Sequence, residues 1–268
     1  MHALLTDKDK SLEYAKIMTL EMGKPIEQAK AEVAKCAGNI LYNQEHTMNF
    51  LKDYELKTVV PNQRAYVQFD SVGPILDIVP WNFPFWMPFK SLLPPLILGN
   101  PILLKHSPST PQCGEALEKI FREAGFEEGE FQNLYVTNEQ AEKVIGDKRV
   151  SGVKFTGSTR GGKEVAAAAG KHMKKGCFEL GGSDPFIVLD DADLNLAVEK
   201  GYVGRMVNSA QACINAKRFI IHDSIYDKFR DGLIEKIKST AKLGDPMDSE
   251  NVNVGPLAIK KNTEELRQ

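Results

Sequence analysis

One cysteine stands in a setting that could make its sulfur reactive. Cys213 lies within the segment 208–218, among small and amide-bearing residues, with no carboxylate in the nine positions on either side. Lys217 and Arg218 follow shortly after it. Positive charge nearby favours the thiolate, which is the nucleophilic form of cysteine. The alternative is a small buried hydrophobic residue, which is the usual role of a free cysteine.

Two other side chains could assist a nucleophilic cysteine. Asn82 stands between aromatic and proline residues in the run Pro80-Trp81-Asn82-Phe83-Pro84. An amide fixed in an apolar wall can donate a hydrogen bond to an oxyanion, which is worth about 3 kcal/mol in a transition state. Glu179 is a lone carboxylate in an apolar run, where burial would make it a better general base. The alternatives are a loop asparagine bound to nearby backbone and a buried glutamate paired with a lysine.

Two stretches could hold a nucleotide at the carboxyl ends of strands. Lys105 closes a predicted strand, at the edge where α/β sheets bind ligands, and a lysine there can reach ribose hydroxyls or phosphate. Gly157 and Ser158 lie between a predicted strand and a predicted helix. Ser158 can cap that helix, whose free N–H groups can receive a pyrophosphate. A surface lysine and a capped turn without a ligand would fit the same residues.

The elements that would position these residues alternate along the chain. Apolar spacing predicts helices over 7–50 with a break at 23–25, and β-formers predict a β-ribbon over 54–70. From residue 72 we expect strands at 72–79, 101–105, 131–136, 150–155, 177–180, 185–189 and 218–222, and helices at 111–123, 139–145, 158–169, 194–207 and 225–241. The apolar, proline-rich region 78–104 is interpreted as buried core and turns. Repeated βα units predict a doubly wound, mostly parallel α/β sheet.

Composition narrows the classes of partner. The chain has 268 residues and a net charge of -2, so no basic field favours nucleic acid. The four cysteines form no CxxC and the five histidines no HxxxH, and we expect neither a disulfide framework nor a metal site. The longest uncharged apolar run, 91–104, is shorter than the ~20 residues that span a bilayer. These features predict a cytoplasmic protein with no membrane or nucleic-acid partner.

Taken in order, these stretches resemble the aldehyde dehydrogenase superfamily over essentially the whole chain. The matching runs are Pro80-Trp81-Asn82-Phe83-Pro84, Leu103-Leu104-Lys105, Phe155-Thr156-Gly157-Ser158, Glu179-Leu180-Gly181-Gly182 and Gln211-Ala212-Cys213. Runs most similar to the succinate-semialdehyde dehydrogenase branch are Leu20-Glu21-Met22-Gly23-Lys24-Pro25, Leu104-Lys105-His106 and Gly181-Gly182-Ser183-Asp184-Pro185-Phe186. The resemblance implies a Rossmann-like cofactor domain over 1–180, with the ribbon 54–70 as an oligomerisation element. It also implies the first part of a second α/β catalytic domain over 181–268.

The resemblance also implies a role for each candidate residue. Cys213 would attack the aldehyde carbon, Asn82 would hold the oxyanion, and Glu179 would activate the water that hydrolyses the thioester. The residues implied to bind NAD or NADP are Pro80, Trp81, Lys105, Ser107, Pro108, Gly157, Ser158, Leu180 and Gly181. The expected reaction is oxidation of a small aldehyde, succinic semialdehyde in this branch, to the carboxylic acid. The full-length form is expected to be a homo-oligomer.

Four departures from the family pattern bear on these expectations. The chain resembles a form truncated at both ends, which would expose a core face and strand edges. Ala210 replaces a glycine, so a left-handed backbone there would carry an extra methyl group. Pro108 replaces a glutamate that faces the ribose 2′-hydroxyl in NAD-preferring members, and NADP is therefore allowed. Cys177 is interpreted as a core residue.

Two alternatives to an aldehyde dehydrogenase that ends in hydrolysis remain open. A CoA-acylating relative would end the reaction by thiolysis, but a hydrolytic base such as Glu179 is then unwanted. A catalytically inactive truncated paralogue would instead bind nucleotide, or a full-length partner through residues 54–70. The intact set of reactive residues favours the enzyme, whereas the length of the chain favours the inactive form.

Overall fold

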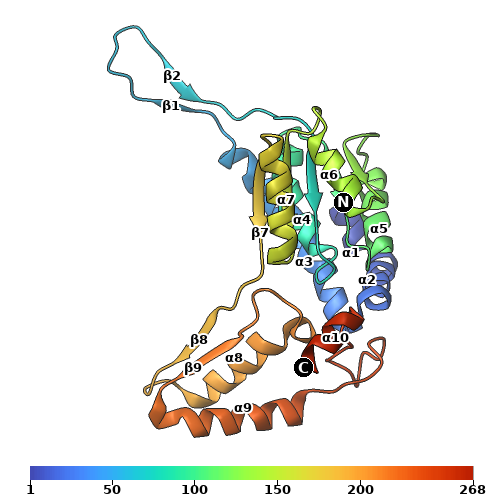
Figure 1. The fold of residues 1–268 in the computed structure, drawn as a ribbon, viewed down its shortest axis with the longest axis vertical. Helices are drawn as coiled ribbons and strands as arrows, with labels where there is room; N and C mark the ends of the chain where they lie inside the picture. The colour runs from blue at the N-terminus through green and yellow to red at the C-terminus, as the bar shows by residue number, and fades with distance from the viewer. Residues whose placement is uncertain (268) are drawn as a thin grey trace. The chain divides into compact units, whose positions relative to one another are not determined.

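The computed structural model describes residues 1–267, which form two compact units (Figure 1). The first unit comprises residues 1–13 and 32–179. The second comprises residues 14–31 and the described residues from Leu180 onward. The sequence interpretation groups residues 14–31 with the N-terminal domain. In the structure, hydrogen bonds join them to the second unit, and one runs from the Ile26 N–H to the Pro246 carbonyl at 2.8 Å.

Three helices occupy the N-terminal region: α1 (His2–Thr6), α2 (Lys8–Met22) and α3 (Ile26–Phe50). Gly23 follows α2 with a φ of 74°, a left-handed conformation that glycine adopts without strain. Pro25 comes next in the break, and it has no N–H with which to continue a helix. The predicted helical region and its break at 23–25 are confirmed.

The first unit is built on a five-stranded sheet. Its strands are β3 (Ile75–Ile78), β4 (Ile102–Lys105), β5 (Phe131–Asn133), β6 (Gly152–Thr156) and β7 (Lys175–Glu179). They lie in the order β5-β4-β3-β6-β7, and every neighbouring pair is parallel. The chain starts at the central strand, builds out to one edge and then returns to build the other. This is the doubly wound topology that the sequence predicts.

Helices cover both faces of this sheet. They are α4 (Trp86–Ile97), α5 (Pro111–Glu123), α6 (Asn138–Gly146) and α7 (Thr159–Lys171). Adjacent residues of a strand point to opposite faces. On β3, Asp77 accepts a hydrogen bond from Ser91 of α4, whereas Ile78 lines a cavity with residues of α6 and α7. Helix α4 therefore covers one face, and α6 and α7 cover the other.

Helix α4 is absent from the sequence prediction, which assigns its residues to buried core and turns. Pro94 and Pro95 lie inside the helix and remove two backbone donors, which is why local propensity argues against it. The helix forms because Phe89, Leu92 and Leu93 are almost completely buried. Tertiary packing of this apolar face outweighs the unfavourable propensity.

Stacked aromatic rings fix the α4 side of the sheet. The ring of Phe121 on α5 lies parallel to that of Phe131 on β5, with centroids 4.0 Å apart. On α4, Phe89 stacks on Phe121 at 5.8 Å. All three side chains are buried, and such pairs contribute about 0.5–1.5 kcal/mol each beyond their burial. The stack therefore holds both helices to the β5 side of the unit.

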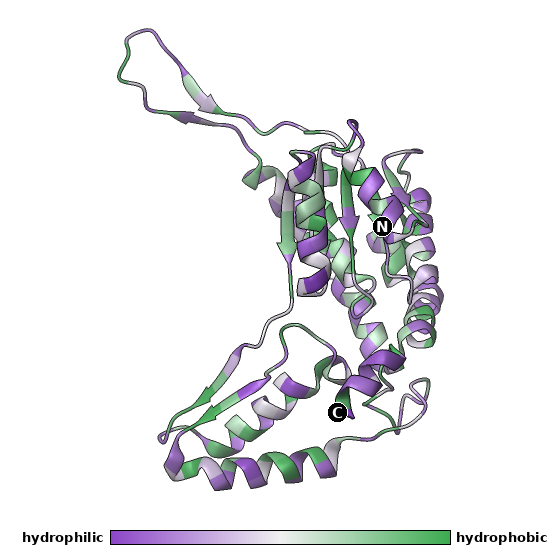
Figure 2. Ribbon diagram, viewed as in Figure 1, coloured by the Kyte–Doolittle hydropathy of each residue, from purple (hydrophilic) through white to green (hydrophobic). Residues whose placement is uncertain are grey.

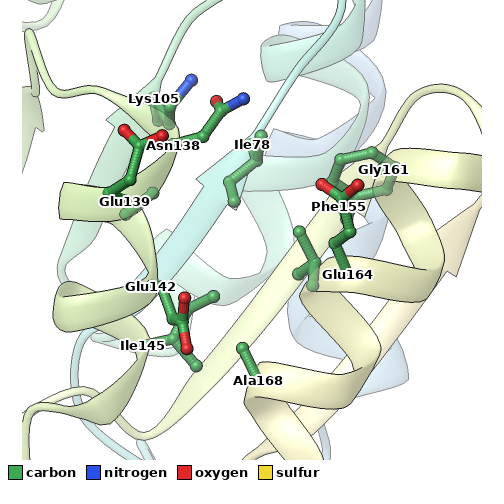
Figure 3. A pocket seen from close by; sticks show the side chains of 12 residues that line it. Ile78, Lys105, Asn138, Glu139, Glu142, Ile145, Phe155, Gly161, Glu164 and Ala168 are labelled. Carbon is green, nitrogen blue, oxygen red and sulfur yellow. The ribbon is translucent and has the colours of Figure 1, made fainter.

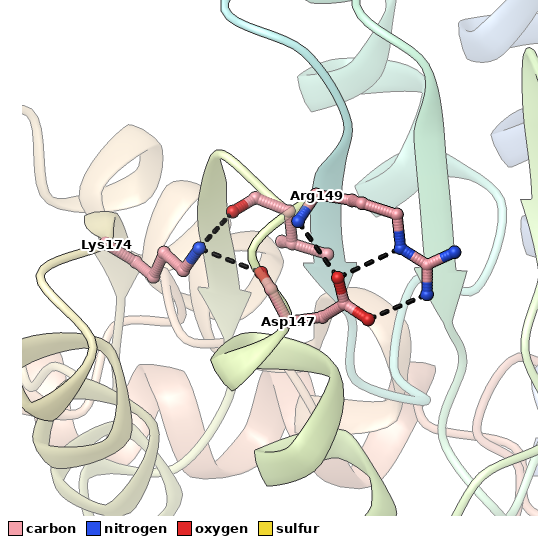
Figure 4. Close-up of polar contacts among 4 residues, drawn as sticks. Asp147, Arg149 and Lys174 are labelled. Carbon is pink, nitrogen blue, oxygen red and sulfur yellow. Dashed lines mark hydrogen bonds and ion pairs between the residues drawn. The ribbon is translucent and has the colours of Figure 1, made fainter.

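Charged groups fix the loop between α6 and β6 (Figure 4). Lys174 donates hydrogen bonds to the carbonyls of Asp147 at 2.9 Å and Val150 at 2.5 Å. The Asp147 carboxylate accepts two hydrogen bonds from the Arg149 guanidinium, which hold the pKa of this carboxyl below its usual range. These contacts set the start of β6, the strand that leads to Gly157.

The predicted ribbon over 54–70 is confirmed as an antiparallel pair of strands, β1 (Tyr54–Leu56) and β2 (Ala65–Val67). Figure 1 shows it as an arm that extends from the rest of the first unit. The side chains of Tyr54, Leu56 and Tyr66 are exposed. An isolated two-stranded ribbon is marginally stable in water, so exposed apolar side chains on it suit contact with a partner.

The second unit contains a two-stranded parallel sheet. Strand β8 (Pro185–Val188) pairs with β9 (Arg218–Ile221), and α8 (Leu194–Met206) and α9 (Tyr226–Thr240) complete two βα units. The rings of Phe186, Phe219 and Phe229 form its aromatic core, with centroids 5.4 to 6.3 Å apart. Two 3₁₀ turns, η1 (Val207–Ala210) and η2 (Asp223–Ile225), and the helix α10 (Lys260–Leu266) complete the unit.

One face of the β8–β9 sheet is uncovered. Ile187 and Ile220 are 60% and 51% exposed, because alternate residues point away from the aromatic core. In the hydropathy colouring of Figure 2, both strands carry hydrophobic residues. The predicted exposure of an apolar face is thus confirmed for this sheet. Within residues 1–267, no helix is both long and apolar enough to cross a bilayer.

A buried ion pair joins β3 to β6. Asp77 is fully buried, and its carboxylate lies 3.4 Å from Lys154 Nζ and accepts a hydrogen bond from Ser91 Oγ at 3.1 Å. Burial raises the pKa of Asp77, because it disfavours the charged form, although Lys154 and Ser91 act in the opposite direction. Removing either Asp77 or Lys154 would therefore leave an uncompensated charge.

We predict that Lys154→Met lowers the free energy of unfolding by about 3 kcal/mol at neutral pH, since it leaves the Asp77 carboxylate buried and unpaired. Urea unfolding followed by tryptophan fluorescence measures this change, because both tryptophans lie in the first unit. The loss should shrink as the pH falls through the raised pKa of Asp77 in the folded state, because protonation removes the uncompensated buried charge. The control Asp77→Asn/Lys154→Met removes both charges and should recover most of the loss. A single variant as stable as the parent would contradict the prediction.

Candidate active site

A cavity of about 300 Å³ lies between α6 and α7, at the carboxyl ends of β3, β4 and β6 (Figure 3). Its apolar lining consists of Ile78, Ala141, Ile145, Phe155, Val165 and Ala168. Its polar lining consists of Lys105, Asn138, Glu139, Glu142 and Glu164. Figure 3 shows Lys105, Asn138 and Glu139 gathered at one end of it. An apolar slot with polar groups at its rim suits a flat, partly polar ligand such as a nucleoside.

Lys105 is the only cation that lines this cavity within the described residues. It is the last residue of β4 and is only 5% exposed, which excludes the alternative of an ordinary surface lysine. Burial lowers its pKa, because the charged form is desolvated. Its ammonium group can still donate several hydrogen bonds to ligand oxygens.

The turn from β6 into α7 borders the same cavity. Ser158 caps α7, since its Oγ accepts a hydrogen bond from the Gly161 N–H at 3.1 Å, as the sequence predicts. A Cβ atom on Gly157 would lie 2.7 Å from the ring of Phe155, so a larger residue there would require that ring to move. The helix N-terminus that follows leaves N–H groups available to an anion.

Ser107 and Pro108 line a second pocket, of about 310 Å³, beyond the ends of β4 and β5. Tyr135 and Thr137 also line it. Ser107 is partly exposed and Pro108 is exposed. Among the described residues that line this pocket there is no carboxylate that would repel a 2′-phosphate.

Asn82 lies in the irregular segment between β3 and α4, with Pro80 and Trp81, and all three are partly exposed. Two buried side chains from elsewhere hold this segment. His106 binds the Pro84 carbonyl, and Glu32 of α3 accepts hydrogen bonds from Phe85 and Trp86. Burial lowers the pKa of His106 to about 4, and the charge of Lys105 acts in the same direction. The imidazole is therefore neutral at neutral pH.

Glu179 is the last residue of β7, and its carbonyl accepts a hydrogen bond from the Gly157 N–H at 3.0 Å. The Glu179 side chain is exposed, so the expectation of a buried glutamate is wrong. Cys177 is also exposed, which corrects its interpretation as a core residue. Both corrections have one cause: β7 is an edge strand, and an edge strand has a neighbour on one side only. Leu180 and Gly181 lie just beyond β7, in the segment that leads to β8.

Cys213 belongs to the second unit and lies in a turn after η1, where it is partly buried. The three residues Asn208, Ser209 and Ala210 have φ values of 57°, 53° and 62°. The left-handed backbone that the sequence raises as one possibility at Ala210 is present. It is unfavourable for any residue with a Cβ, by about 1–2 kcal/mol. The loop that carries the cysteine is therefore strained.

Polar side chains of the loop itself keep it in this conformation. The Asn208 side chain donates to the Gln211 carbonyl at 3.1 Å, and the Gln211 side chain accepts from the Ala258 N–H at 3.0 Å. Asn215 is completely buried and donates to the carbonyls of Arg205 and Val207. Each of these amides satisfies backbone groups that a strained loop cannot pair by itself.

Lys217 lies beside the cysteine. Its ammonium group donates to the Cys213 carbonyl at 3.0 Å and to the Gly182 carbonyl at 2.5 Å. Arg218 similarly donates to the Ser183 carbonyl at 2.8 Å. The two cations thus join the cysteine turn to the segment before β8. A positive group is present next to the sulfur-bearing residue, as the sequence predicts.

Several residues of the cavity were not singled out from the sequence. Ala141 and Ile145 on α6, and Val165 and Ala168 on α7, line its apolar part. Each pair is spaced four or three residues apart, which places both members on one face of their helix. This spacing is the sequence signal that could have identified them. Glu32 carries no such signal, because it binds the backbone of Phe85, 53 positions away.

The sequence matches the aldehyde dehydrogenase family over residues 2–268. It is 43% identical over 249 residues to the succinate semialdehyde dehydrogenase [NAD(P)+] Sad of Escherichia coli (strain K12), covering 93% of this chain and 53% of that protein. It is 42% identical to the succinate-semialdehyde dehydrogenase [NADP(+)] of Mycobacterium avium (strain 104), covering 95% and 54%. The chain therefore spans about half the length of these curated relatives.

Solved structures agree with this match. The succinic semialdehyde dehydrogenase from Streptococcus pyogenes, in complex with NADP+, superposes with a TM-score of 0.94 at 39% sequence identity. The match covers 99% of this chain and 58% of that one. The predicted α/β fold and the family resemblance are thereby confirmed.

We predict that Ala210→Gly raises the free energy of unfolding of the second unit by about 1 kcal/mol, because glycine adopts a positive φ without the Cβ clash. Urea unfolding followed by far-UV circular dichroism measures the change. The control Ala197→Gly lies within α8 of the same unit, where glycine should destabilise by about 0.5–1 kcal/mol. If both substitutions change the free energy of unfolding in the same direction, the inference of backbone strain at Ala210 is contradicted.

Proposed function

Because the chain belongs to the aldehyde dehydrogenase family, we propose that it serves NAD(P)-dependent oxidation of an aldehyde to the carboxylic acid. The observation that carries this proposal is the cavity between α6 and α7, with buried Lys105 at one end and the Ser158-capped N-terminus of α7 beside it. We assign the first unit, residues 1–13 and 32–179, to the cofactor domain and the second unit to the catalytic domain.

The residues of the cavity fit a dinucleotide. Its apolar slot would hold the adenine ring, and the Lys105 ammonium would donate to ribose hydroxyls. Gly157 carries no side chain, so the backbone there can approach a pyrophosphate closely, and the α7 N–H groups would face it. Pro80, Trp81, Leu180 and Gly181 would border the nicotinamide half. When bound, NAD(P) would supply the hydride acceptor.

The chain's own residues would carry the carbon chemistry. The Cys213 sulfur would attack the aldehyde carbon, and the carbonyl oxygen would become an oxyanion held by the Asn82 amide and the Cys213 N–H. Loss of hydride would leave a thioester on Cys213. Glu179 would then take a proton from water, whose oxygen would attack the thioester carbon and release the acid with the free thiol.

The proposed cofactor and substrate are inferred from residue 108 and from the names of the relatives. Pro108 offers no carboxylate to repel a 2′-phosphate, and the relatives above are named for NAD(P)+ and NADP(+). We therefore propose that NADP is accepted. Succinic semialdehyde is the proposed substrate, because both curated relatives are named for it. The four free thiols suit a reducing compartment such as the cytoplasm.

A catalytically inactive chain that binds nucleotide or a full-length partner is the second candidate. The observation in its favour is that the chain spans about half of its relatives. The uncovered face formed by Ile187 and Ile220 favours the same candidate, since it would need a covering partner.

We predict that folded chain, NADP and succinic semialdehyde give an absorbance increase at 340 nm that Cys213→Ala abolishes, because no thioester can form. Glu179→Gln should keep the first hydride burst but slow steady turnover by roughly 100-fold or more, since only hydrolysis needs the base. The same assay with NAD in place of NADP measures the cofactor preference. No signal from folded parent chain with either nucleotide would favour the inactive candidate, and unchanged turnover in Glu179→Gln would remove this residue from the mechanism.

We also propose that the β1–β2 ribbon joins copies of the protein, because its apolar side chains are exposed. Tyr54→Asp/Leu56→Asp places charges on one face of the ribbon and should lower the mass measured by light scattering. The control Leu243→Asp changes an exposed leucine outside the ribbon and should leave the mass unchanged. A parent chain that stays monomeric at every concentration would contradict the proposal.

A further inference from the structure

The segment 80–86, which carries Asn82, has no regular structure until α4 begins at Trp86. Pro84 and Phe85 within it are buried. Buried backbone groups need hydrogen-bond partners, and an irregular segment cannot supply all of them from its own backbone. Here the partners are side chains from two other elements, His106 and Glu32.

His106 holds the segment through one carbonyl. Its Nε2 lies 2.9 Å from the Pro84 oxygen. A carbonyl oxygen can only accept, so Nε2 carries the proton and Nδ1 is an acceptor. Nδ1 accordingly accepts from the Ser107 N–H at 2.9 Å and the Thr110 hydroxyl at 2.8 Å. The ring is 7% exposed and is fixed in one tautomer and one orientation.

Glu32 holds the same segment from the helix side. One of its carboxylate oxygens accepts from the N–H of Phe85 at 2.9 Å and of Trp86 at 2.8 Å. These are the first donors of α4, and the N-cap residue Phe85 has no side chain that could accept from them. Glu32 is 4% exposed, so water competes little for these bonds. Glu32 of α3 therefore serves as the acceptor that an N-cap side chain of α4 would otherwise provide.

We propose that His106 and Glu32 are positioning residues that together hold the Asn82 amide in place. They bind consecutive residues, Pro84 and Phe85, directly after Asn82 and Phe83, which leaves the backbone of the segment little rotational freedom. The consequence for catalysis rests on the proposed function of Asn82. The positioning itself does not.

The same contact joins the segment to the nucleotide cavity. His106 directly follows Lys105, and both residues are buried at the end of β4. The bond from His106 to Pro84 makes the end of β4 and the segment after β3 one hydrogen-bonded piece. Lys105 and Asn82 consequently keep a fixed spacing, which is what two groups that act on one bound complex require.

Tryptophan fluorescence reports on this segment directly, because the chain's two tryptophans, Trp81 and Trp86, both lie in it. In a Trp86→Phe background, Trp81 is the single emitter and is the neighbour of Asn82. We would compare His106→Asn with His106→Gln there. Glutamine can keep an N–H donor near the place of Nε2, whereas the shorter asparagine can keep an acceptor near the place of Nδ1 but cannot carry its NH2 as far as Nε2.

We expect His106→Asn to shift the Trp81 emission to the red and to increase its quenching by acrylamide, and His106→Gln to stay close to the parent. Equal quenching in the parent and both variants would overturn the proposal. If far-UV circular dichroism shows that His106→Asn is unfolded, Glu32→Met and Glu32→Gln test the other anchor. Methionine removes the acceptor and should increase quenching, and glutamine retains it; equal quenching in that pair would also overturn the proposal.

The hydride burst separates this proposal from the proposed function. His106→Asn should slow the burst roughly tenfold to hundredfold, as expected when a reacting group is misplaced, and His106→Gln should recover it. A folded parent chain without any burst would contradict the proposed function, while the quenching comparison would still decide the positioning role. Increased quenching with an unchanged burst would contradict the link between these anchors and catalysis.

Discussion

The parallel register of the five-stranded sheet is the constraint on which the candidate site depends. Ile78 pairs with Lys105 on one side and with Phe155 on the other, and one step further Thr156 pairs with Glu179. Because parallel strands all end at the same edge, the segments that follow these pairs emerge side by side. The asparagine segment, the lysine and the capped turn are thus neighbours through backbone pairing, before any of their side chains touch.

Much of this sheet could be predicted from the sequence, because its strands and helices differ in period and in their terminating residues. Helix α5 has the predicted bounds, since Pro111 starts it and Gly125, with a φ of 94°, follows its end. Helix α4 could not be predicted in the same way. Its local signal is set by Pro94 and Pro95, and its stability comes from burial that only the folded chain provides.

The candidate site likewise has features that the sequence indicates and features that it does not. A left-handed backbone at Ala210 is one possibility that the sequence raises, because alanine stands where the family pattern has glycine, and the cause is local. The burial of Lys105 and the exposure of Cys177 and Glu179 could not be predicted. They depend on which strand lies at an edge and which face a helix covers, and these are properties of the assembled sheet.

The two irregular segments are held in physically different ways, and this decides what a motif can reveal. The cysteine loop is held largely by its own amides, Asn208, Gln211 and Asn215, so the residues that position Cys213 lie inside the stretch that draws attention to it. The segment around Asn82 is held by Glu32 and His106, which come from other elements. A polar side chain that binds backbone far along the chain leaves no pattern at the position it supports. The groups that place a reactive amide must therefore be sought among buried polar residues, each of which needs a partner.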